Sequence, residues 1–331
     1  MTETDIPGER RGNMSGSNTK PVKGGHGLWV YPLGAVLFLA VLFAGVSVGS
    51  VRISLSDTWS ILMKYFFGRG DTAGLESGTE TIIAMVRMPR VLLAAMTGGA
   101  LSICGAVMQS LLRNPLADGS TLGVSSGGAL GAVLSMVLGL RFSLFPELGL
   151  AISSITFSFL SLVFILTLAY RIDKSLSTNT IILTGVIFSM LASSITSFLV
   201  VLSGDSLKQV VFWSMGSFSG KGWDHVLLMA PVFVLGSLAI MAFSNELNAF
   251  SLGEEQARYI GVDTKTVKMI LLILTSVLIG VSVSVSGTIG FVGLVIPHIT
   301  RMITGPDHRK LLPASLLTGG IFMVLTDLLA R

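Results

Sequence analysis

Charged side chains are scarce in this chain. Asp, Glu, Lys and Arg make up 12% of its 331 residues, whereas hydrophobic residues make up 51%. A soluble domain carries charge on roughly a quarter of its residues. The composition therefore excludes an ordinary soluble domain and indicates an integral membrane protein. The net charge of +4 does not point to nucleic acid, because lysine and arginine in a membrane protein mainly mark the orientation of its loops.

Groups suited to catalysis or metal binding are also scarce. Cys104 is the only cysteine and lies within an apolar run, which excludes a disulfide framework and a cysteine metal site. The nearest approach to a nucleotide-binding loop, residues 216–222, has one residue too few between its glycines, and Gly222 stands where a hydroxyl would meet magnesium. The sequence has no catalytic triad, paired intramembrane carboxylates or metal-ligand cluster. We therefore expect no enzyme activity, no metal site and no cofactor bound by this chain.

Long apolar runs dominate the remainder of the sequence. Their lengths suit helices that cross a hydrocarbon core of about 30 Å, and they exceed the alternating ten-residue strands of a membrane barrel. The expected fold is an all-α integral membrane protein, a polytopic helical bundle. The candidate spans are residues 28–51, 91–111, 122–140, 145–170, 180–203, 224–243, 267–286, 289–304 and 311–330.

The distribution of basic residues predicts the orientation. Residues 1–27 are polar, rich in Gly, Ser and charge, and without periodicity, which predicts a disordered tail. When this tail is placed in the cytoplasm, the short outer loops hold little more than Arg141, Lys208 and Lys221, and most other basic residues lie inside. We therefore expect a multi-pass protein with a cytoplasmic N-terminus.

One outer segment, residues 52–90, is longer than the other outer loops. It contains an apolar stripe that predicts a helix lying along the outer membrane interface, in contact with lipid. It ends in Arg87 and Arg90, one turn apart at the entrance of a span, with Pro89 between them. These arginines either present positive charge outward or anchor the helix to lipid headgroups.

The longest polar interruption in the second half, residues 244–266, is a candidate coupling segment. Ser251 and Glu254 form a capping-box pattern, and Gly261 stands where a helix C-terminus favours a left-handed residue, so a short helix is expected between them. Asp263 is expected to cap the following helix. A short polar helix between two spans is suited to act as a lever for a cytoplasmic partner; the alternative is an ordinary surface loop.

Other features of the spans indicate packing. Gly98, Ser102 and Ala106 recur every four residues, a spacing that lets helix backbones approach closely. Asp327 is the one carboxylate deep in an apolar run, and its favoured role is helix pairing, with a proton relay as the second alternative. Ser177 or Thr178 is suited to cap the span that follows.

Several short stretches occur together in a characteristic order. They are Arg87-Met88-Pro89-Arg90, Gly105 to Gln109, Asn114 to Ala117, Leu122 to Gly127, Leu252-Gly253 with Ala257, Gly261-Val262, and Gly290 to His298. In this order they resemble the FecCD permeases, the membrane subunits of type II ABC importers for iron-siderophores, haem and vitamin B12. The resemblance covers residues 28–331.

The resemblance implies a ten-helix subunit of the bacterial inner membrane that pairs with a second permease copy, either identical or a paralogue. Two cytoplasmic ATPase subunits would use ATP and Mg²⁺, and an extracytoplasmic binding protein would deliver an iron chelate, most readily an iron-siderophore, with haem or cobalamin as alternatives. An ion- or proton-coupled transporter is the alternative function. The chain stops at Arg331, where the family continues into a tenth helix, so about nine of ten spans are expected.

The resemblance also assigns roles to residues. The ATPase-coupling helix corresponds to Leu252, Gly253, Glu254, Glu255, Gln256, Ala257, Arg258, Tyr259, Ile260, Gly261 and Val262. The cytoplasmic gate corresponds to Ser177, Thr178 and Asn179. The arginines that would dock the binding protein through glutamates on its two lobes correspond to Arg87, Arg90 and Arg331.

Overall fold

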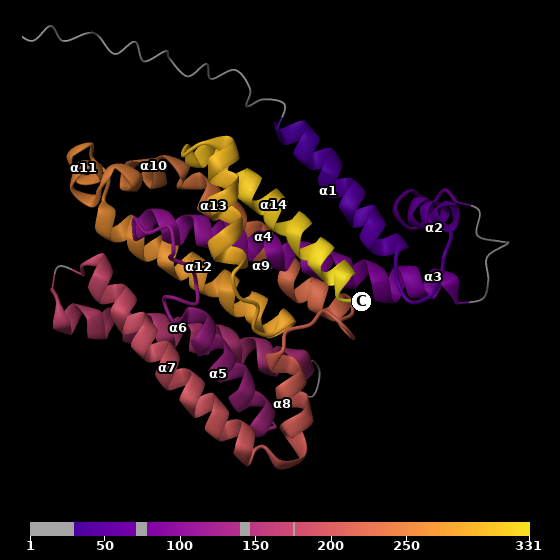
Figure 1. Cartoon of the computed structure of the whole chain (residues 1–331), viewed down its shortest axis with the longest axis horizontal. Helices are drawn as coiled ribbons and strands as arrows, with labels where there is room; N and C mark the ends of the chain where they lie inside the picture. The colour runs from indigo at the N-terminus through magenta and orange to yellow at the C-terminus, as the bar shows by residue number, and fades with distance from the viewer. Residues whose placement is uncertain (1–29, 71–77, 140–145, 175) are drawn as a thin grey trace, which may run out of the picture.

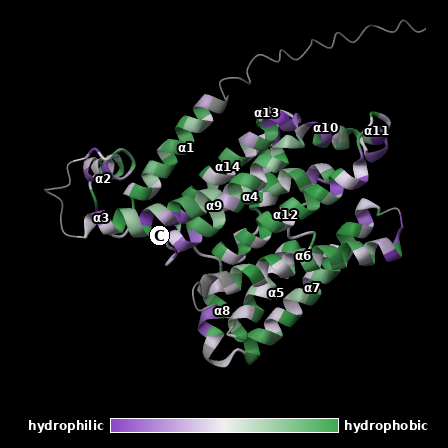
Figure 2. Ribbon diagram, turned by 180° about the vertical axis from the view of Figure 1, so that it is seen from behind, coloured by the Kyte–Doolittle hydropathy of each residue, from purple (hydrophilic) through white to green (hydrophobic). Residues whose placement is uncertain are grey.

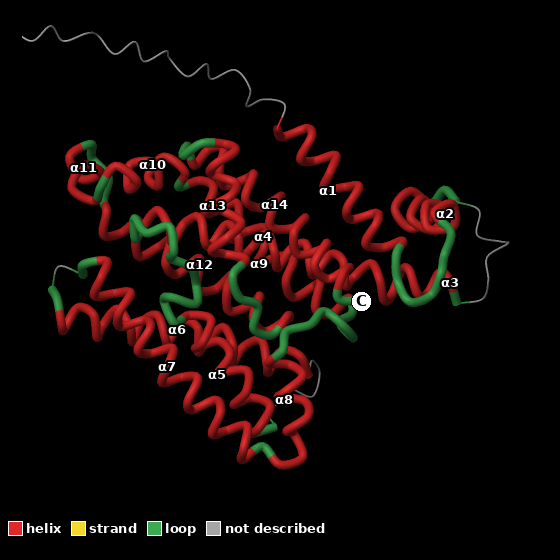
Figure 3. The backbone as a smooth tube through the Cα atoms, in the orientation of Figure 1, coloured by secondary structure: helices red, strands yellow, loops and turns green. Residues whose placement is uncertain are grey.

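The computed structural model describes residues 30–70, 78–139, 146–174 and 176–331. Throughout these ranges every regular element is a helix (Figure 3). The predicted tail, residues 1–27, lies outside the described residues. The all-α prediction is therefore confirmed for the part of the chain that the structure describes.

The helices follow the predicted apolar runs. In chain order they are α1 (Val30–Ser47), α2 (Leu55–Phe67), α3 (Thr79–Thr81), the π-helical turn η1 (Ile82–Arg87), α4 (Met88–Leu111), α5 (Val124–Val137), α6 (Pro146–Ile172), α7 (Thr178–Leu202), the short turn η2 (Gly204–Ser206), α8 (Leu207–Ser214), α9 (Trp223–Ala242), α10 (Ser244–Leu252), α11 (Glu254–Tyr259), α12 (Thr264–Ser286), α13 (Val292–Thr304) and α14 (His308–Leu329).

The predicted spans correspond one for one to apolar helices. Six helices are long and apolar enough to cross a membrane, and three shorter apolar helices, Pro32–Ser47, Val124–Val137 and Val292–Thr304, account for the other predicted spans. Hydrophobic residues predominate along these helices, and hydrophilic residues are more frequent toward the two ends of the bundle (Figure 2). The protein is thus a multi-pass membrane protein.

Helix α4 forms the centre of the molecule (Figure 1). Most of its residues are buried, and it packs against α1, α9, α12, α13 and α14. Glycines at the contacts let the backbone of α4 lie close to the backbones of its neighbours. A Cβ on Gly98 would collide with the Gly319 carbonyl of α14, and one on Gly105 would collide with the Gly293 carbonyl of α13. The small residues of α4 therefore serve helix packing, as their spacing predicted.

A second group of helices, α5 to α8, packs against the first group mainly through contacts of α6 with α12 (Figure 1). Glycine also allows α5 and α6 to lie close together, because Gly127 and Gly128 of α5 contact Ser161 and Ser158 of α6. The hydroxyl of Ser158 donates to the Val124 carbonyl at 3.2 Å. Close glycine contacts and buried hydroxyls therefore join α5 to α6 without bulky side chains between them.

The two ends of the bundle carry different elements. Helices α10 and α11 lie at one end, near the turn that joins α6 to α7, whereas α2, α3 and the C-terminal residue lie at the other (Figures 1 and 2). Helix α14 runs between these ends. Its first residue is next to α10, and its last turn approaches the end of α1.

One detail of the predicted outer segment was wrong. Arg87 and Arg90 do not stand at a helix entrance, because the helix begins at Thr79 and passes through both residues into α4. Proline inside a helix collides with the carbonyl four residues earlier. Here the turn before Pro89 widens: the Met88 N–H donates to the Ile83 carbonyl, five residues back. The π-helical turn accommodates the proline and continues the helix.

Candidate functional site

The predicted coupling segment folds as two short helices, α10 and α11, that break at Gly253. The capping box expected at Ser251 and Glu254 is absent, because Ser251 lies inside α10 and its hydroxyl donates to the Asn248 carbonyl at 2.6 Å. Gly253 takes the N-cap position of α11 instead. The sequence pattern missed α10, since a serine that bonds backward within its own helix looks the same in sequence as one that caps the next helix.

Gly253 fixes the break between the two helices. Its backbone angles, φ +131° and ψ 150°, lie in a region that is essentially restricted to glycine. A Cβ at this position would also collide with the side-chain oxygen of Gln256. The Gln256 oxygen ends a flexible side chain that can move aside, so it is the backbone conformation of residue 253 that requires glycine at the angle between α10 and α11.

A polar clip, formed by Asn248, Asp307, His308 and Ser110, joins α10 to the start of α14. The Asn248 amide nitrogen donates to Asp307 Oδ1 at 2.9 Å, and Asn248 Oδ1 accepts from the His308 backbone N–H at 2.8 Å. His308 Nδ1 lies 2.8 Å from the same Asn248 oxygen, so this ring nitrogen carries a proton. His308 Nε2 meets the Ser110 hydroxyl of α4. The clip thus connects three helices.

Asp307 also caps α14 by accepting from the Arg309 backbone N–H at 3.1 Å. The hydrogen bond from the Asn248 side chain, the largest of several causes, holds the pKa of the Asp307 carboxyl below its ordinary value. The carboxylate therefore stays ionised at neutral pH and keeps accepting from Asn248. Beside it, Arg309 Nε donates to Asn245 Oδ1 at 2.8 Å.

The segment presents apolar side chains to its surroundings. Leu252, Tyr259 and Ile260 are 66%, 87% and 67% exposed, whereas Ala257 is fully buried against the bundle. Large apolar side chains exposed on a short polar segment are typical of a protein contact. The other predicted coupling residues surround them: Glu254, Glu255, Gln256, Arg258 and Gly261 are exposed, and Val262 is half-buried.

Two predictions at the end of the segment are confirmed. Gly261 has φ +93°, the left-handed conformation expected after a helix. The Asp263 carboxylate caps α12 by accepting from the Thr266 N–H at 3.2 Å. Hydrogen bonding with Thr266 lowers the pKa of the Asp263 carboxyl.

An ion pair ties α11 to α12. Lys268 Nζ of α12 lies 3.4 Å from Glu254 Oε2 of α11.

The predicted gate turn lies at the start of α7. Ser177 occupies the N-cap position, as expected, but its hydroxyl contacts Thr180 Oγ1 at 2.9 Å and makes no capping bond to a backbone N–H. Thr178 is half-buried, and Asn179 is exposed. The turn therefore lies at the helix start with two of its three side chains facing outward.

The three predicted docking arginines come together at the opposite end of the bundle. Asp327 of α14 accepts from Arg90 Nη2 at 2.8 Å and from Arg331 Nη2 at 2.8 Å. Arg87 donates to the Ser47 carbonyl at the end of α1, at 2.6 Å. The favoured role of Asp327, helix pairing, is thus confirmed, and its partners are the arginines themselves.

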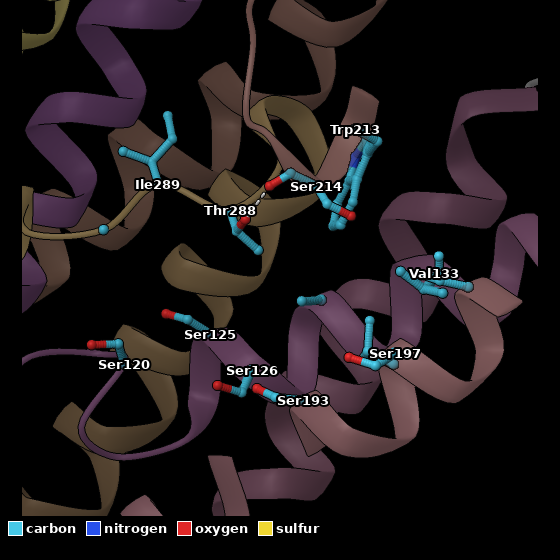
Figure 4. Close-up of a pocket in the computed structure, with 14 residues that line it drawn as sticks. Ser120, Ser125, Ser126, Val133, Ser193, Ser197, Trp213, Ser214, Thr288 and Ile289 are labelled. Atoms are coloured by element: carbon cyan, nitrogen blue, oxygen red, sulfur yellow. Dashed lines mark hydrogen bonds between the residues drawn. The ribbon is translucent and has the colours of Figure 1, made fainter. Parts of the chain in front are cut away.

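A pocket of about 400 Å³ opens between α5, α7, α8 and the turn before α13 (Figure 4). Hydroxyl groups are its main polar feature. The Thr288 hydroxyl donates to the Ser214 carbonyl at 2.6 Å, which anchors the turn to α8. The Ser and Thr residues that line it are Ser120, Ser125, Ser126, Ser193, Thr196, Ser197, Ser214 and Thr288, and no charged side chain is among the lining residues.

Sequence reasoning missed Asn248 and His308, which lie 60 residues apart and carry no local motif. Within the described ranges, no group of three or more His, Cys, Asp or Glu is placed to hold a metal ion. The polar chemistry of the described bundle is therefore concentrated in the clip at one end, the arginines at the other, and the hydroxyl-lined pocket.

Comparison with known proteins identifies the family. The model of the FecCD transport family matches residues 37–331. The chain belongs to the FecCD family. It is 44% identical to the uncharacterized ABC transporter permease YvrB of Bacillus subtilis over 89% of this chain and 83% of that protein. It is 40% identical to the cobalamin import permease BtuC of Halobacterium salinarum, over 78% of this chain and 69% of that protein.

The architecture of this FecCD permease matches a solved one. A metal-chelate type ABC transporter in an inward-facing conformation superposes with a TM-score of 0.78 and 31% identity, covering 92% of this chain and 90% of that chain. The family and the architecture together make this protein an ABC importer permease.

Proposed function

We propose that this FecCD permease carries a metal chelate inward, with a ferric siderophore as the first candidate and haem or cobalamin as alternatives. Two relatives support a chelate: the similar structure is of metal-chelate type, and cobalamin, named for the relative at 40% identity, is a cobalt chelate. The hydroxyl-lined pocket between α5, α7 and α8 supports it too, because its lining is uncharged and combines small hydroxyls with apolar side chains, which suits a bulky cargo that must pass without binding tightly.

The energy source is ATP hydrolysed, with Mg²⁺, by two cytoplasmic ATPase subunits that contact α10 and α11. The observation that carries this proposal is that Leu252, Tyr259 and Ile260 are exposed apolar side chains at the ends of α10 and α11. The break at Gly253 and the clip between Asn248 and His308 hold these two helices in place. An exposed apolar patch on a rigid support is suited to receive force from a partner. This permease itself catalyses no reaction in the proposal.

The same assignment sets the orientation. The end with α10, α11 and the gate turn Ser177, Thr178 and Asn179 faces the cytoplasm, and the N-terminus lies on that side. Arg87, Arg90 and Arg331 then face outward, where the cluster receives acidic side chains of an extracytoplasmic binding protein. Charge pairs of this kind steer docking and set its register.

A second permease copy completes the transporter. Helix α7 is apolar along its length, yet few of its residues are buried within this chain. Its exposed side chains, among them Ile187, Met190 and Phe198, therefore face lipid or a second copy. We place the second copy beside α7, because the hydroxyl-lined pocket also opens next to this helix.

The test is uptake into vesicles that contain this permease, its ATPase and its binding protein. Labelled ferric siderophore, haem and cobalamin are offered separately. ATP is supplied on the side of the membrane where the ATPase subunits lie, and it is left out of the control. ATP-dependent accumulation of one of them is the expected result. The proposal on cargo is wrong if none accumulates while the same vesicles, supplied with another substrate such as molybdate, transport it.

A further inference from the structure

A buried ionic cluster, consisting of Asp327 with Arg90 and Arg331, organises the outer end of the bundle. Both oxygens of Asp327 accept from Arg90 Nε, at 3.0 Å each, and Arg331 Nε approaches Asp327 Oδ2 at 3.1 Å. The Asp327 side chain is only 5% exposed, whereas those of Arg90 and Arg331 are 21% and 10% exposed. The carboxylate thus lies beneath two guanidinium groups.

The arginines are also held by the end of α1. Arg331 Nη1 donates to the Gly45 and Val48 carbonyls at 2.7 and 2.8 Å. Arg87 Nη1 donates to the Val46 carbonyl at 3.2 Å, in addition to its bond with Ser47. The last carbonyls of a helix have no partner within the helix and carry partial negative charge. They therefore fix two guanidinium groups without adding a full negative charge.

A pocket of about 320 Å³ opens in front of this cluster. The guanidinium-bearing residues Arg87, Arg90 and Arg331 line it together with three serines, and Asp327 is not among the lining residues. A guanidinium has five N–H donors. Arg90 directs Nε and one N–H of Nη2 to Asp327, which leaves further N–H donors for a ligand in the pocket.

We infer that Asp327 is a positioning residue for docking of an acidic protein partner: it holds Arg90 and Arg331 side by side from behind, so that their remaining N–H groups present a prearranged site for a carboxylate. The inference rests on the proposed docking of the binding protein. Bidentate contacts restrict the orientation of a guanidinium as well as its place. A prearranged site loses less conformational entropy on binding, which mainly lowers the dissociation rate.

The direction in which Asp327→Asn changes docking distinguishes a positioning role of Asp327 from a purely electrostatic one. Asp327→Asn removes a negative charge, so charge alone would strengthen docking of an acidic partner. Positioning requires the reverse. We expect Asp327→Asn to raise the dissociation rate of the binding protein by roughly tenfold, with the association rate unchanged or slightly higher at low salt. Asp327→Glu, which keeps the carboxylate, should recover part of the slow dissociation.

The measurement uses the assembled transporter in lipid nanodiscs and its binding protein, with association and dissociation rates recorded at several salt concentrations. Thermal unfolding of each variant checks that it is folded. Asp327→Ser is a second variant in case Asp327→Asn fails to fold, because it also removes the carboxylate and leaves all three arginines in place; its dissociation rate should also rise.

Arg90→Gln separates failure of the inference from failure of the proposed docking. If Arg90→Gln weakens docking but Asp327→Asn dissociates as slowly as the parent protein, the inference on Asp327 is wrong and the docking site stands. If neither substitution changes docking, the arginines are not the docking site, and both proposals are wrong.

Discussion

The backbone N–H of His308 donates to Asn248 Oδ1 at 2.8 Å, and the His308 ring approaches the same oxygen. One amide oxygen therefore fixes both the start of α14 and the orientation of a buried imidazole. Since α14 continues to Asp327 at the other end of the bundle, this contact joins the proposed ATPase side to the helix that carries the outer ionic cluster.

Removing the Asn248 side chain should weaken this connection. Asn248→Ala leaves the buried His308 N–H groups without an acceptor, so we expect a loss of about 1–3 kcal/mol in stability together with reduced ATP-driven uptake. Thermal unfolding and vesicle uptake measure the two effects. Asn245→Ala is the matched control, because Asn245 contacts the exposed Arg309 side chain and should change stability much less. Equal effects of the two substitutions would show that the clip has no special role.

Gly253 should tolerate no side chain. Gly253→Ala places a Cβ in a backbone region that costs about 1–3 kcal/mol, and we expect α10 and α11 to change their relative angle. Association of the ATPase, measured by co-purification and by uptake, should fall accordingly. Gly222→Ala is the control, since Gly222 has open space around it and φ −109°. Normal ATPase association in Gly253→Ala would disprove the requirement for the break.

The crossing of α4 and α14 depends on Gly98. Gly98→Ala directs a methyl group at the Gly319 carbonyl and at Met323 Cβ, 2.5 Å away. Overpacking of this kind costs about 1–3 kcal/mol, which a lower thermal unfolding midpoint in detergent would report. Gly34→Ala, whose nearest neighbour would be Leu317 at 3.9 Å, should leave the midpoint unchanged or raise it slightly, because alanine favours the α1 helix more than glycine does. The packing account fails if Gly98→Ala is as stable as Gly34→Ala.

The clip should depend on pH through Asp307. Hydrogen bonding to Asn248 lowers the pKa of this carboxyl in the folded protein. A lowered folded pKa gives stability that is fully present above the unfolded value of about 3.9 and is lost as the pH falls through the folded value. The stability advantage of the parent protein over Asp307→Asn should thus be constant from about pH 7 to 5 and be lost only as the pH falls through the lowered pKa of the folded protein. An advantage that persists in acid would exclude the ionised carboxylate as its source.

The sequence predicted those parts of the fold that depend on local pattern. Apolar runs gave the spans, the spacing around Gly98 gave close packing, and Asp263 and Gly261 gave helix ends, because each depends on neighbours within a few residues. Local pattern failed at Ser251, where two hydrogen-bonding roles share one sequence signature. It also placed Arg87 and Arg90 at a helix start, because a proline usually ends a helix and the π-helical turn has no sequence signature.

Long-range contacts could not be predicted. Asp327 was recognised as a carboxylate that needs a partner, but Arg90, its partner on α4, is 237 residues away. The bond between Asn248 and His308 likewise depends on where α10 meets α14. These pairings follow from helix packing, and they make up most of the candidate sites.

Uptake by vesicles with an inactive ATPase distinguishes ATP-driven import from proton-coupled import. Vesicles containing the permease, the binding protein and either an active or a catalytically inactive ATPase are given labelled metal chelate, with and without an imposed proton gradient. We expect accumulation only with the active ATPase and ATP, independent of the gradient. Accumulation that persists with the inactive ATPase and follows the proton gradient would contradict it and identify a proton-coupled transporter.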